Sequence, residues 1–450
     1  MKTYLDPASC PAERPPLAQM GAATRELHDA LDARARTDGV AWLHPERRTI
    51  QRDLLGSPNV VAWQEAKAAF LIAGDGAWSE LPHLYARYGT PGTAALISAL
   101  RDIERASCAV VTDCGMQATA LVADALLAPG AHAEILRQIY NKAKTYFEWA
   151  AKRVGATLTF VDDGDIAAVA AAIRPETRFV FAETFTNPLM RAQDITALRA
   201  ACGDAHLVVD GTIATPWAFR APLLAQGASV VVGSLTKALG GQDTALGGYV
   251  ATNDTELGNQ LMDLLAMRGG ILDDERASRV AANLPAAPET HARRCASASR
   301  IAAFLASHPA VERVFHPSLP DHPDASTIAR DYIRHGSIVS FRVRGADELR
   351  HRHIADVLVS CTVPRYALSF DGLATKVNHH KTVSEYFTPA DQVAKLGIDR
   401  LIRLGIGLED ADDLIACLNW TLHNADRVTT ADLDAWRAAR AAALGLRTPG

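Results

Sequence analysis

Residues 206–212 read HLVVDGT, and residues 229–242 read SVVVGSLTKALGGQ. Each stretch begins with a short run of apolar, mostly β-branched residues and ends at polar side chains, which is typical of a strand buried inside a sheet. In open α/β sheets, ligands bind at the carboxyl ends of the strands. The polar residues at the ends of these runs, Asp210 and Lys237, are therefore the first candidates for a functional site.

Similar apolar runs precede these two, namely CAVVT at 108–112, TLTFV at 157–161 and RFVFAE at 178–183. Helical patterns such as TALVADALL separate several of them. Short apolar strands that alternate with helices predict an α/β fold with a mainly parallel sheet covered on both faces. We expect three parts, which are an N-terminal arm with helices (1–85), a large domain that carries the sheet (86–285) and a smaller C-terminal α+β domain (286–450).

The composition excludes several classes of protein. The net charge is −5, so the chain has no basic surface for nucleic acid or for an anionic membrane. No apolar stretch approaches the length of a membrane span, and the N-terminus lacks the apolar segment of a signal peptide. The seven cysteines are scattered and form no CxxC pair. We therefore expect a cytoplasmic metabolic enzyme that has reduced thiols, acts on a small molecule and uses no metal.

Lys237 follows a strand and stands beside two hydroxyl residues, Ser234 and Thr236. A lysine that forms an imine needs a partly apolar or electropositive setting so that its neutral amine is accessible, and the hydroxyls are suited to binding a phosphate. Asp210 ends a hydrophobic strand, where a carboxylate is costly unless it is paired. Taken singly, the lysine could be a solvated loop residue and the aspartate a helix cap or metal ligand. Together they indicate a site for pyridoxal 5′-phosphate (PLP), whose ring nitrogen Asp210 would keep protonated.

A helix beginning near Gly115 and Met116 offers backbone NH groups to an anion. The alternative is an ordinary tight turn with a cap. Tyr140 offers a flat face for stacking on a cofactor ring, or for simple packing.

Six segments in order resemble the Cys/Met metabolism (trans-sulfuration) family of fold-type I PLP enzymes, which includes cystathionine γ-synthase and the cystathionine lyases. The similarity runs from Tyr85 to Leu422. The matching segments are LYARYGTPGTAAL, DCGMQAT, ETFTNPLMR, VVDGT, GSLTKAL and LIRLGIGLEDADDLIACL. The resemblance implies a mainly parallel seven-stranded sheet in the large domain and a homotetramer whose active sites are shared between subunits.

The resemblance also implies roles for individual residues. Lys237 forms the Schiff base with PLP, Asp210 pairs with the ring nitrogen and Tyr140 stacks on the ring. Ser369 orients the lysine, and Arg403 binds the α-carboxylate of the amino-acid substrate. The other substrate contacts are Ser369, Tyr140 and Asn187. The remaining cofactor contacts are Gly115, Met116, Ser234 and Thr236 on the phosphate, Thr212 and Asn187 near the ring, and Tyr85 and Arg87 on the phosphate of a neighbouring subunit.

The implied reaction is γ-replacement or γ-elimination on an amino acid with a side-chain leaving group, such as a homoserine ester or cystathionine. It would proceed through the Lys237 aldimine and a vinylglycine-type intermediate. The segment RYGTPGT instead favours β-elimination, and an aminotransferase of the same fold or an inactive binding protein are further alternatives. The segment LSFDGLAT at 368–375, which would surround the distal end of the substrate, departs from the family at Leu368, Phe370, Asp371 and Thr375. These departures predict a substrate with an unusual side chain or an unusual nucleophile as the second substrate.

Overall fold

The computed structural model describes residues 18, 22–38, 55–73, 85–240, 243–386, 388–389, 391, 393–394 and 397–446. The chain divides into two compact units, Met1–Pro91 and Gly92–Gly450. Of the N-terminal arm with helices predicted for residues 1–85, the structure describes residues 18, 22–38, 55–73 and 85.

Among its described residues, the first unit contains helices α1 (Ala22–Asp38) and α2 (Ser57–Ala73) and the short 3-10 helix η4 (Ala86–Tyr88). Trp63 of α2 is buried, and its ring centroid lies 5.6 Å from that of Tyr88. This aromatic contact ties α2 to the segment that enters the second unit.

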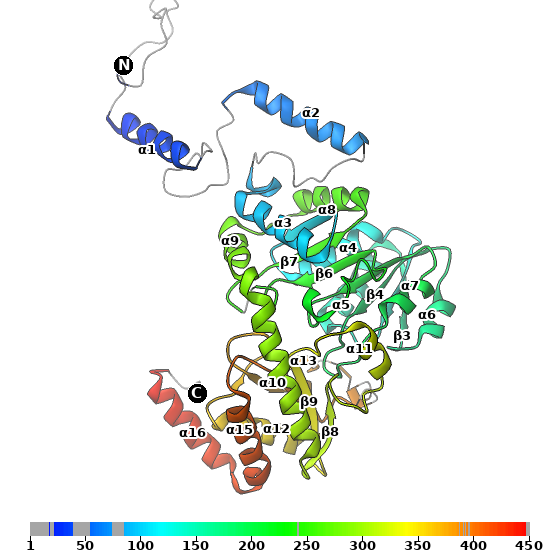
Figure 1. The fold of residues 1–450 in the computed structure, drawn as a ribbon, viewed down its shortest axis with the longest axis vertical. Helices are drawn as coiled ribbons and strands as arrows, with labels where there is room; N and C mark the ends of the chain where they lie inside the picture. The colour runs from blue at the N-terminus through cyan, green and yellow to red at the C-terminus, as the bar shows by residue number, and fades with distance from the viewer. Residues whose placement is uncertain are drawn as a thin grey trace, which may run out of the picture. The chain divides into compact units, whose positions relative to one another are not determined.

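A seven-stranded sheet dominates the first part of the second unit (Figure 1), with strand order β1-β7-β6-β5-β4-β2-β3. Strand β7 is antiparallel to both its neighbours, and all the other pairings are parallel. The mainly parallel α/β prediction is therefore confirmed. The strands are β1 (Cys108–Thr112), β2 (His132–Leu136), β3 (Thr157–Val161), β4 (Thr177–Glu183), β5 (His206–Asp210), β6 (Val230–Ser234) and β7 (Gly248–Thr252).

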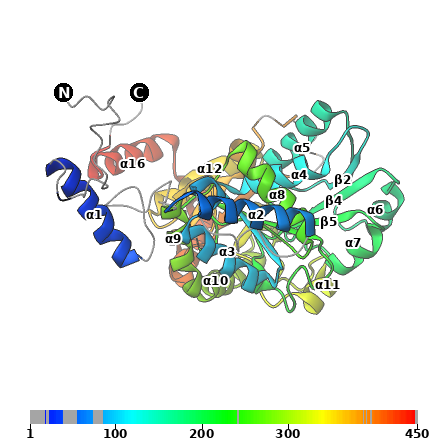
Figure 2. The ribbon, with the colours of Figure 1, turned by 90° about the horizontal axis from the view of Figure 1, so that it is seen from above.

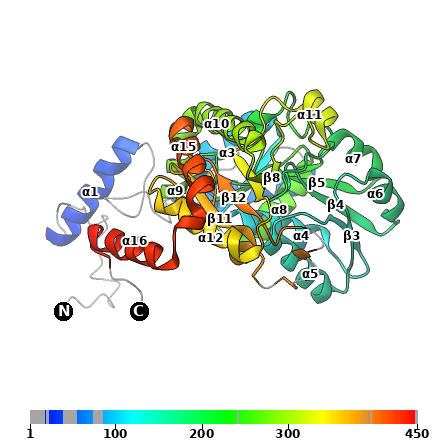
Figure 3. The ribbon, with the colours of Figure 1, turned by 90° about the horizontal axis from the view of Figure 1, so that it is seen from below.

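Helices cover both faces of this sheet. Figures 2 and 3 show α4 and α5 on one face and α6 and α7 on the other. Aspartates cap four of the helices of this part by accepting a hydrogen bond from the backbone NH three residues on, which satisfies a donor that the helix leaves free. The helices are α3 (Pro91–Glu104), α4 (Gly115–Leu126), α5 (Asn141–Val154), α6 (Ile166–Ala172), α7 (Ile195–Ala201), α8 (Thr255–Arg268) and α9 (Asp274–Asn283).

The C-terminal part is built on a second sheet with the order β10-β11-β12-β9-β8. Its strands are β8 (Val311–Phe315), β9 (Ile338–Val343), β10 (Arg365–Tyr366), β11 (Lys376–His379) and β12 (Ile402–Gly405). Side chains such as Ile301, Phe341 and Leu404 form a continuous buried core under it. The helices are α10 (Ala287–Ser307), α11 (Ala325–Asp331), α12 (Glu348–Ser360), α13 (His380–Ser384), α15 (Ala411–Asn424) and α16 (Thr430–Ala443).

The predicted boundary at 285/286 lies just before the start of α10 at Ala287 and stays a prediction. In the part of the chain that the structure describes, no helix is both long and apolar enough to cross a bilayer.

Candidate active site

Two carboxyl groups lie side by side where β4 and β5 end. Glu183 and Asp210 are register partners, and the backbone NH of Thr212 donates to Asp210 Oδ1 at 2.8 Å. Burial raises the pKa of Asp210. Burial and then the negative charge of Asp210 raise the pKa of Glu183 well above its usual range. In both groups burial disfavours the charged form, and for Glu183 the negative charge of Asp210 adds to this effect.

Lys237 follows β6 and extends toward the C-terminal sheet. Its Nζ donates to Ser369 Oγ and lies 4.6 Å from the centroid of the Phe370 ring. Burial, joined by the charge of Arg403, lowers the pKa of Lys237 to about 8, although Asp371 acts in the opposite direction. A sizeable fraction of this amine is neutral at physiological pH, as a nucleophilic lysine requires.

Arg403 lies on β12 and is only 3% exposed. Its Nη2 donates to the carbonyl of Leu368 at 2.7 Å, and its Nη1 donates to Asn187 Oδ1 at 3.3 Å. Burial lowers the pKa of Arg403 to about 10. Because no carboxylate pairs with it among the described residues, the guanidinium is suited to binding an anionic ligand.

Tyr140 is half-exposed and stands directly before α5. Its backbone NH donates to Glu183 Oε1 at 2.6 Å, which anchors the tyrosine to the strand end that carries the acid pair. The ring is thereby left available on the surface of the site. Stacking on a cofactor stays a prediction.

The start of α4 packs against the end of β6. A Cβ atom on Gly115 would lie 2.9 Å from Ser234 Cβ, so a glycine is needed for this approach. The backbone NH of Ser234 donates to Thr212 Oγ1 at 2.9 Å, and Thr236 Oγ1 accepts from the NH of Gly247 at 3.2 Å. Hydroxyl groups thus lie near a helix N-terminus, a combination suited to a phosphate.

The sequence that forms this site matches a known family of proteins. A family model described as Cys/Met metabolism PLP-dependent enzyme matches residues 65–423. The chain belongs to this family.

Relatives of this PLP enzyme catalyse several different reactions. The cystathionine γ-synthase of Mycobacterium tuberculosis is 34% identical over 340 residues, which cover 75% of this chain and 86% of the relative. The O-succinylhomoserine sulfhydrylase of Pseudomonas aeruginosa is 32% identical and covers 85% of this chain and 94% of its own length. The crystal structure of MetB from Corynebacterium glutamicum superposes with a TM-score of 0.72 at 30% identity, over 76% of this chain and 87% of MetB.

The described residues of this PLP enzyme fit the cofactor. Lys237 supplies an amine of lowered pKa, and Asp210 supplies a carboxyl that forms no ion pair in the described parts of the chain. The cradle at Gly115 offers NH and hydroxyl donors to the phosphate. When bound, PLP supplies an electron sink for negative charge at the substrate's Cα.

Tyr85 and Arg87 lie in the first unit of the enzyme. There the Arg87 guanidinium carbon stands 5.4 Å from the Tyr85 ring centroid and 5.3 Å from that of Tyr88. Their contact with a neighbouring subunit stays a prediction.

Sequence reasoning missed three polar residues of this site, Glu183, Asp243 and Lys376. Glu183 begins the segment ETFTNPLMR, but an acid at the end of a strand is equally typical of a helix cap, so its position alone did not indicate a site residue. Asp243 and Lys376 are far apart in sequence, and no motif joins them. Their carboxylate and ammonium groups form an ion pair next to Ser369.

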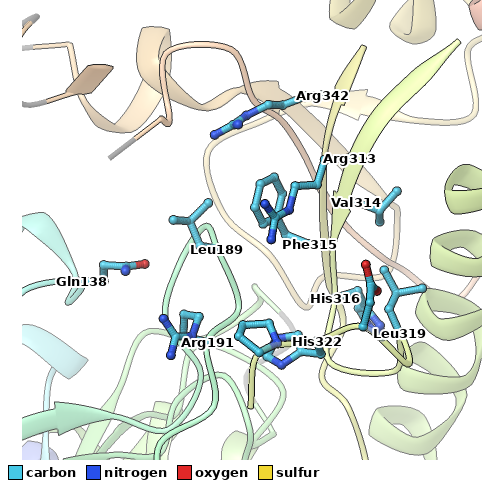
Figure 4. Close-up of a pocket in the computed structure, with 12 residues that line it drawn as sticks. Gln138, Leu189, Arg191, Arg313, Val314, Phe315, His316, Leu319, His322 and Arg342 are labelled. Carbon is cyan, nitrogen blue, oxygen red and sulfur yellow. The ribbon is translucent and has the colours of Figure 1, made fainter. Parts of the chain in front are cut away.

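The enzyme has a separate cavity of about 350 Å³ (Figure 4), lined by none of the predicted site residues. Arg313 and Arg342 line it from β8 and β9, with their guanidinium carbons 5.1 and 5.2 Å from the ring centroid of Phe315. Arg191, which also lines it, is paired with Asp324 at 2.7 Å.

Proposed function

We propose that this enzyme catalyses γ-replacement or γ-elimination on an amino acid that carries a side-chain leaving group. The observation that carries the proposal is that adjacent residues hold Lys237 and Arg403. Lys237 Nζ donates to Ser369 Oγ, and Arg403 Nη2 donates to the carbonyl of Leu368 at 2.7 Å. An α-amino acid presents a carboxylate to such a guanidinium and its Cα proton to such a base.

Each residue has a distinct task in this proposal. Arg403 binds the α-carboxylate and fixes the orientation of Cα, supported by Asn187 at 3.3 Å. Asp210 keeps the ring nitrogen of the cofactor protonated, and Tyr140 covers the ring. Lys237 removes the proton from Cα of the substrate and then one from Cβ. Lys237 is suited to both transfers because its amine stands on a flexible stem and its pKa is about 8.

The proposal also concerns the whole protein. We propose a cytoplasmic homotetramer in which Tyr85 and Arg87 contribute to the phosphate site of a neighbouring subunit.

β-Elimination is the second candidate reaction, supported by the segment RYGTPGT at 87–93.

The reaction is tested by incubating the PLP-loaded enzyme with O-acetylhomoserine, O-succinylhomoserine, homoserine phosphate, cystathionine and methionine, with and without thiol nucleophiles. Mass spectrometry would follow the 2-oxo acids and replacement products, with Lys237→Ala as the control. We expect 2-oxobutyrate or a γ-substituted product. Pyruvate alone would establish β-elimination, and amino transfer to an added 2-oxo acid without elimination would establish an aminotransferase.

The cofactor attachment is tested separately by borohydride reduction of the PLP-loaded enzyme. A phosphopyridoxyl group on Lys237 is the expected product. Its absence from that residue would defeat the proposed function, whatever the substrate.

A further inference from the structure

Four polar side chains form a continuous line that leads away from the Lys237 amine. Lys237 Nζ donates to Ser369 Oγ, and Ser369 Oγ donates to Asp243 Oδ1 at 2.9 Å. The second oxygen of Asp243 forms an ion pair with Lys376 Nζ. The line therefore joins two amines through one hydroxyl and one carboxylate.

The backbone is shaped to allow this line. Asp243 adopts the left-handed region with φ +61°, and its NH donates to the carbonyl of Thr236 at 3.1 Å. A Cβ on Gly372 would lie 2.7 Å from Asp243 Oδ2 and 2.9 Å from Lys376 Nζ. The ion pair therefore requires a glycine at position 372, because a side chain there would occupy its space. Asp243 itself adopts a left-handed backbone conformation that aspartate tolerates better than most residues.

The single proton of the Ser369 hydroxyl gives the line a direction. When that proton is donated to Asp243, only the lone pairs of the oxygen face Lys237, so the lysine must act as the donor. A carboxylate behind the hydroxyl strengthens it as an acceptor. Asp243 therefore determines how the hydroxyl holds the amine.

Lys376 balances the charge of Asp243. Its side chain is 13% exposed, and that of Asp243 is 27% exposed, so neither charge is fully hydrated. Without Lys376, the carboxylate of Asp243 would raise the pKa of Lys237. Without Asp243, the ammonium of Lys376 would lower it. Burial, then the charges of Lys237 and Arg403, lower the pKa of Lys376 to about 8.

We propose that Asp243 and Lys376 are positioning residues for the Lys237 amine and act on it through Ser369. The significance of this pair for catalysis rests on the proposed role of Lys237. The other charged groups that face the amine are Asp371 and Arg403. Asp371 accepts hydrogen bonds from Ser337 Oγ and, at 3.3 Å, from the NH of Ala238. Because these partners differ from those of Asp243 and Lys376, the pair acts on the Lys237 amine separately from Asp371.

The test measures the amine of Lys237 directly on the full chain freed of PLP. Acetic anhydride labels neutral amines, and mass spectrometry of the peptide containing Lys237 gives the pH at which its labelling is half-maximal. We expect Asp243→Asn to lower that pH by about one unit, because Lys376 then stands unbalanced. Lys376→Met should raise it by about one unit, because Asp243 is then unbalanced. The double variant should return close to the wild-type value.

Opposite shifts distinguish a charge effect from a general loss of structure, which would move both variants the same way. Asp426→Asn is the matched control, since it removes an exposed carboxylate that pairs with Arg350 at 2.8 Å. Unchanged half-labelling in both single variants, or shifts of the same sign, would overturn the proposal. Should Asp243→Asn fail to fold, Lys376→Met alone still decides. Failure of borohydride to label Lys237 in the PLP-loaded enzyme would defeat the proposed function, while opposite shifts in the cofactor-free chain would still establish the coupling.

Discussion

At the scale of single residues, burial sets the reactivity of this site. It lowers the pKa of the Lys237 amine and raises the pKa of Glu183 and Asp210. Each shift disfavours the charged form, as the transfer of an ion out of water requires. The ligands supply the missing opposite charges, since a ring nitrogen would face Asp210 and a substrate carboxylate would face Arg403.

The amine of Lys237 gives a prediction about pH. We expect the rate of PLP attachment to rise with pH and to level off near pH 8, because only the neutral amine reacts and its pKa falls from 10.5 to about 8. Stopped-flow absorbance on the cofactor-free chain would measure this rate, with N-acetyl-lysine as the control. A plateau at the ordinary lysine value would contradict the effect of burial.

The two neighbouring carboxyls give a matched pair of variants. Asp210→Asn should weaken PLP binding by about 3 kcal/mol, because it leaves a buried cationic ring nitrogen without its partner. Glu183→Gln should change binding by less than about 1 kcal/mol, because burial and the neighbouring Asp210 disfavour the charged form of Glu183 and the amide oxygen still accepts from the backbone NH of Tyr140. Equilibrium titration with PLP measures both. Equal losses in the two variants would show that the charge does not reside on Asp210.

At the scale of secondary-structure elements, buried polar contacts fix how helices dock on the sheet. Tyr249 of β7 donates to Glu104 Oε1 at 2.5 Å, which joins this strand to the last residue of α3. The ring of Tyr249 passes over Gly233 of β6, where an added Cβ would lie 2.4 Å from it. Tyr249, the register partner of Gly233, therefore helps to set the position of the strand that carries Ser234.

Glu104 predicts how stability depends on pH. Burial raises its pKa from 4.5 to about 7, so between these values the folded state keeps a proton that the unfolded state releases. The free energy of unfolding therefore falls by about 3 kcal/mol as pH rises through this window. Glu104→Gln should remove that share of the pH dependence. Urea unfolding on both sides of the window measures it, with the exposed Asp102→Asn on the same helix as the control. A variant with the same pH slope as the wild type would refute this assignment.

At the scale of the whole molecule, the proposed sharing of sites between subunits leads to a complementation experiment. Arg87→Ala and Lys237→Ala subunits should each be nearly inactive. Because each site would take Arg87 from one subunit and Lys237 from another, one site of every mixed pair would be intact. Random reassembly of equal amounts should restore about a quarter of the wild-type activity. Activity assays after mixed refolding test this, and no recovery despite confirmed mixing would place both residues in one subunit's site.

The sequence predicted the sheet and most of the site because both leave local patterns. Apolar β-branched runs predicted β1, β3, β4, β5 and β6, whereas β2 and β7 escaped notice. The β2 segment HAEIL has Glu134 at its centre, so its sequence resembles that of a surface segment, although Glu134 is buried. Lys237, Asp210 and Arg403 were predicted as site residues because ordered family motifs surround them.

The sequence by itself determined the fold class and the family and predicted which side chains bear the chemistry, because apolar periodicity and motif order are properties of the chain alone. Only the tertiary structure decided how burial shifts the pKa of each carboxyl and which groups surround the Lys237 amine. Ser369 is 132 positions from Lys237, and Asp243 pairs with Lys376 on a distant strand. Proton affinities and ion pairs depend on burial and on distances through space, and these exist only once the two sheets have formed.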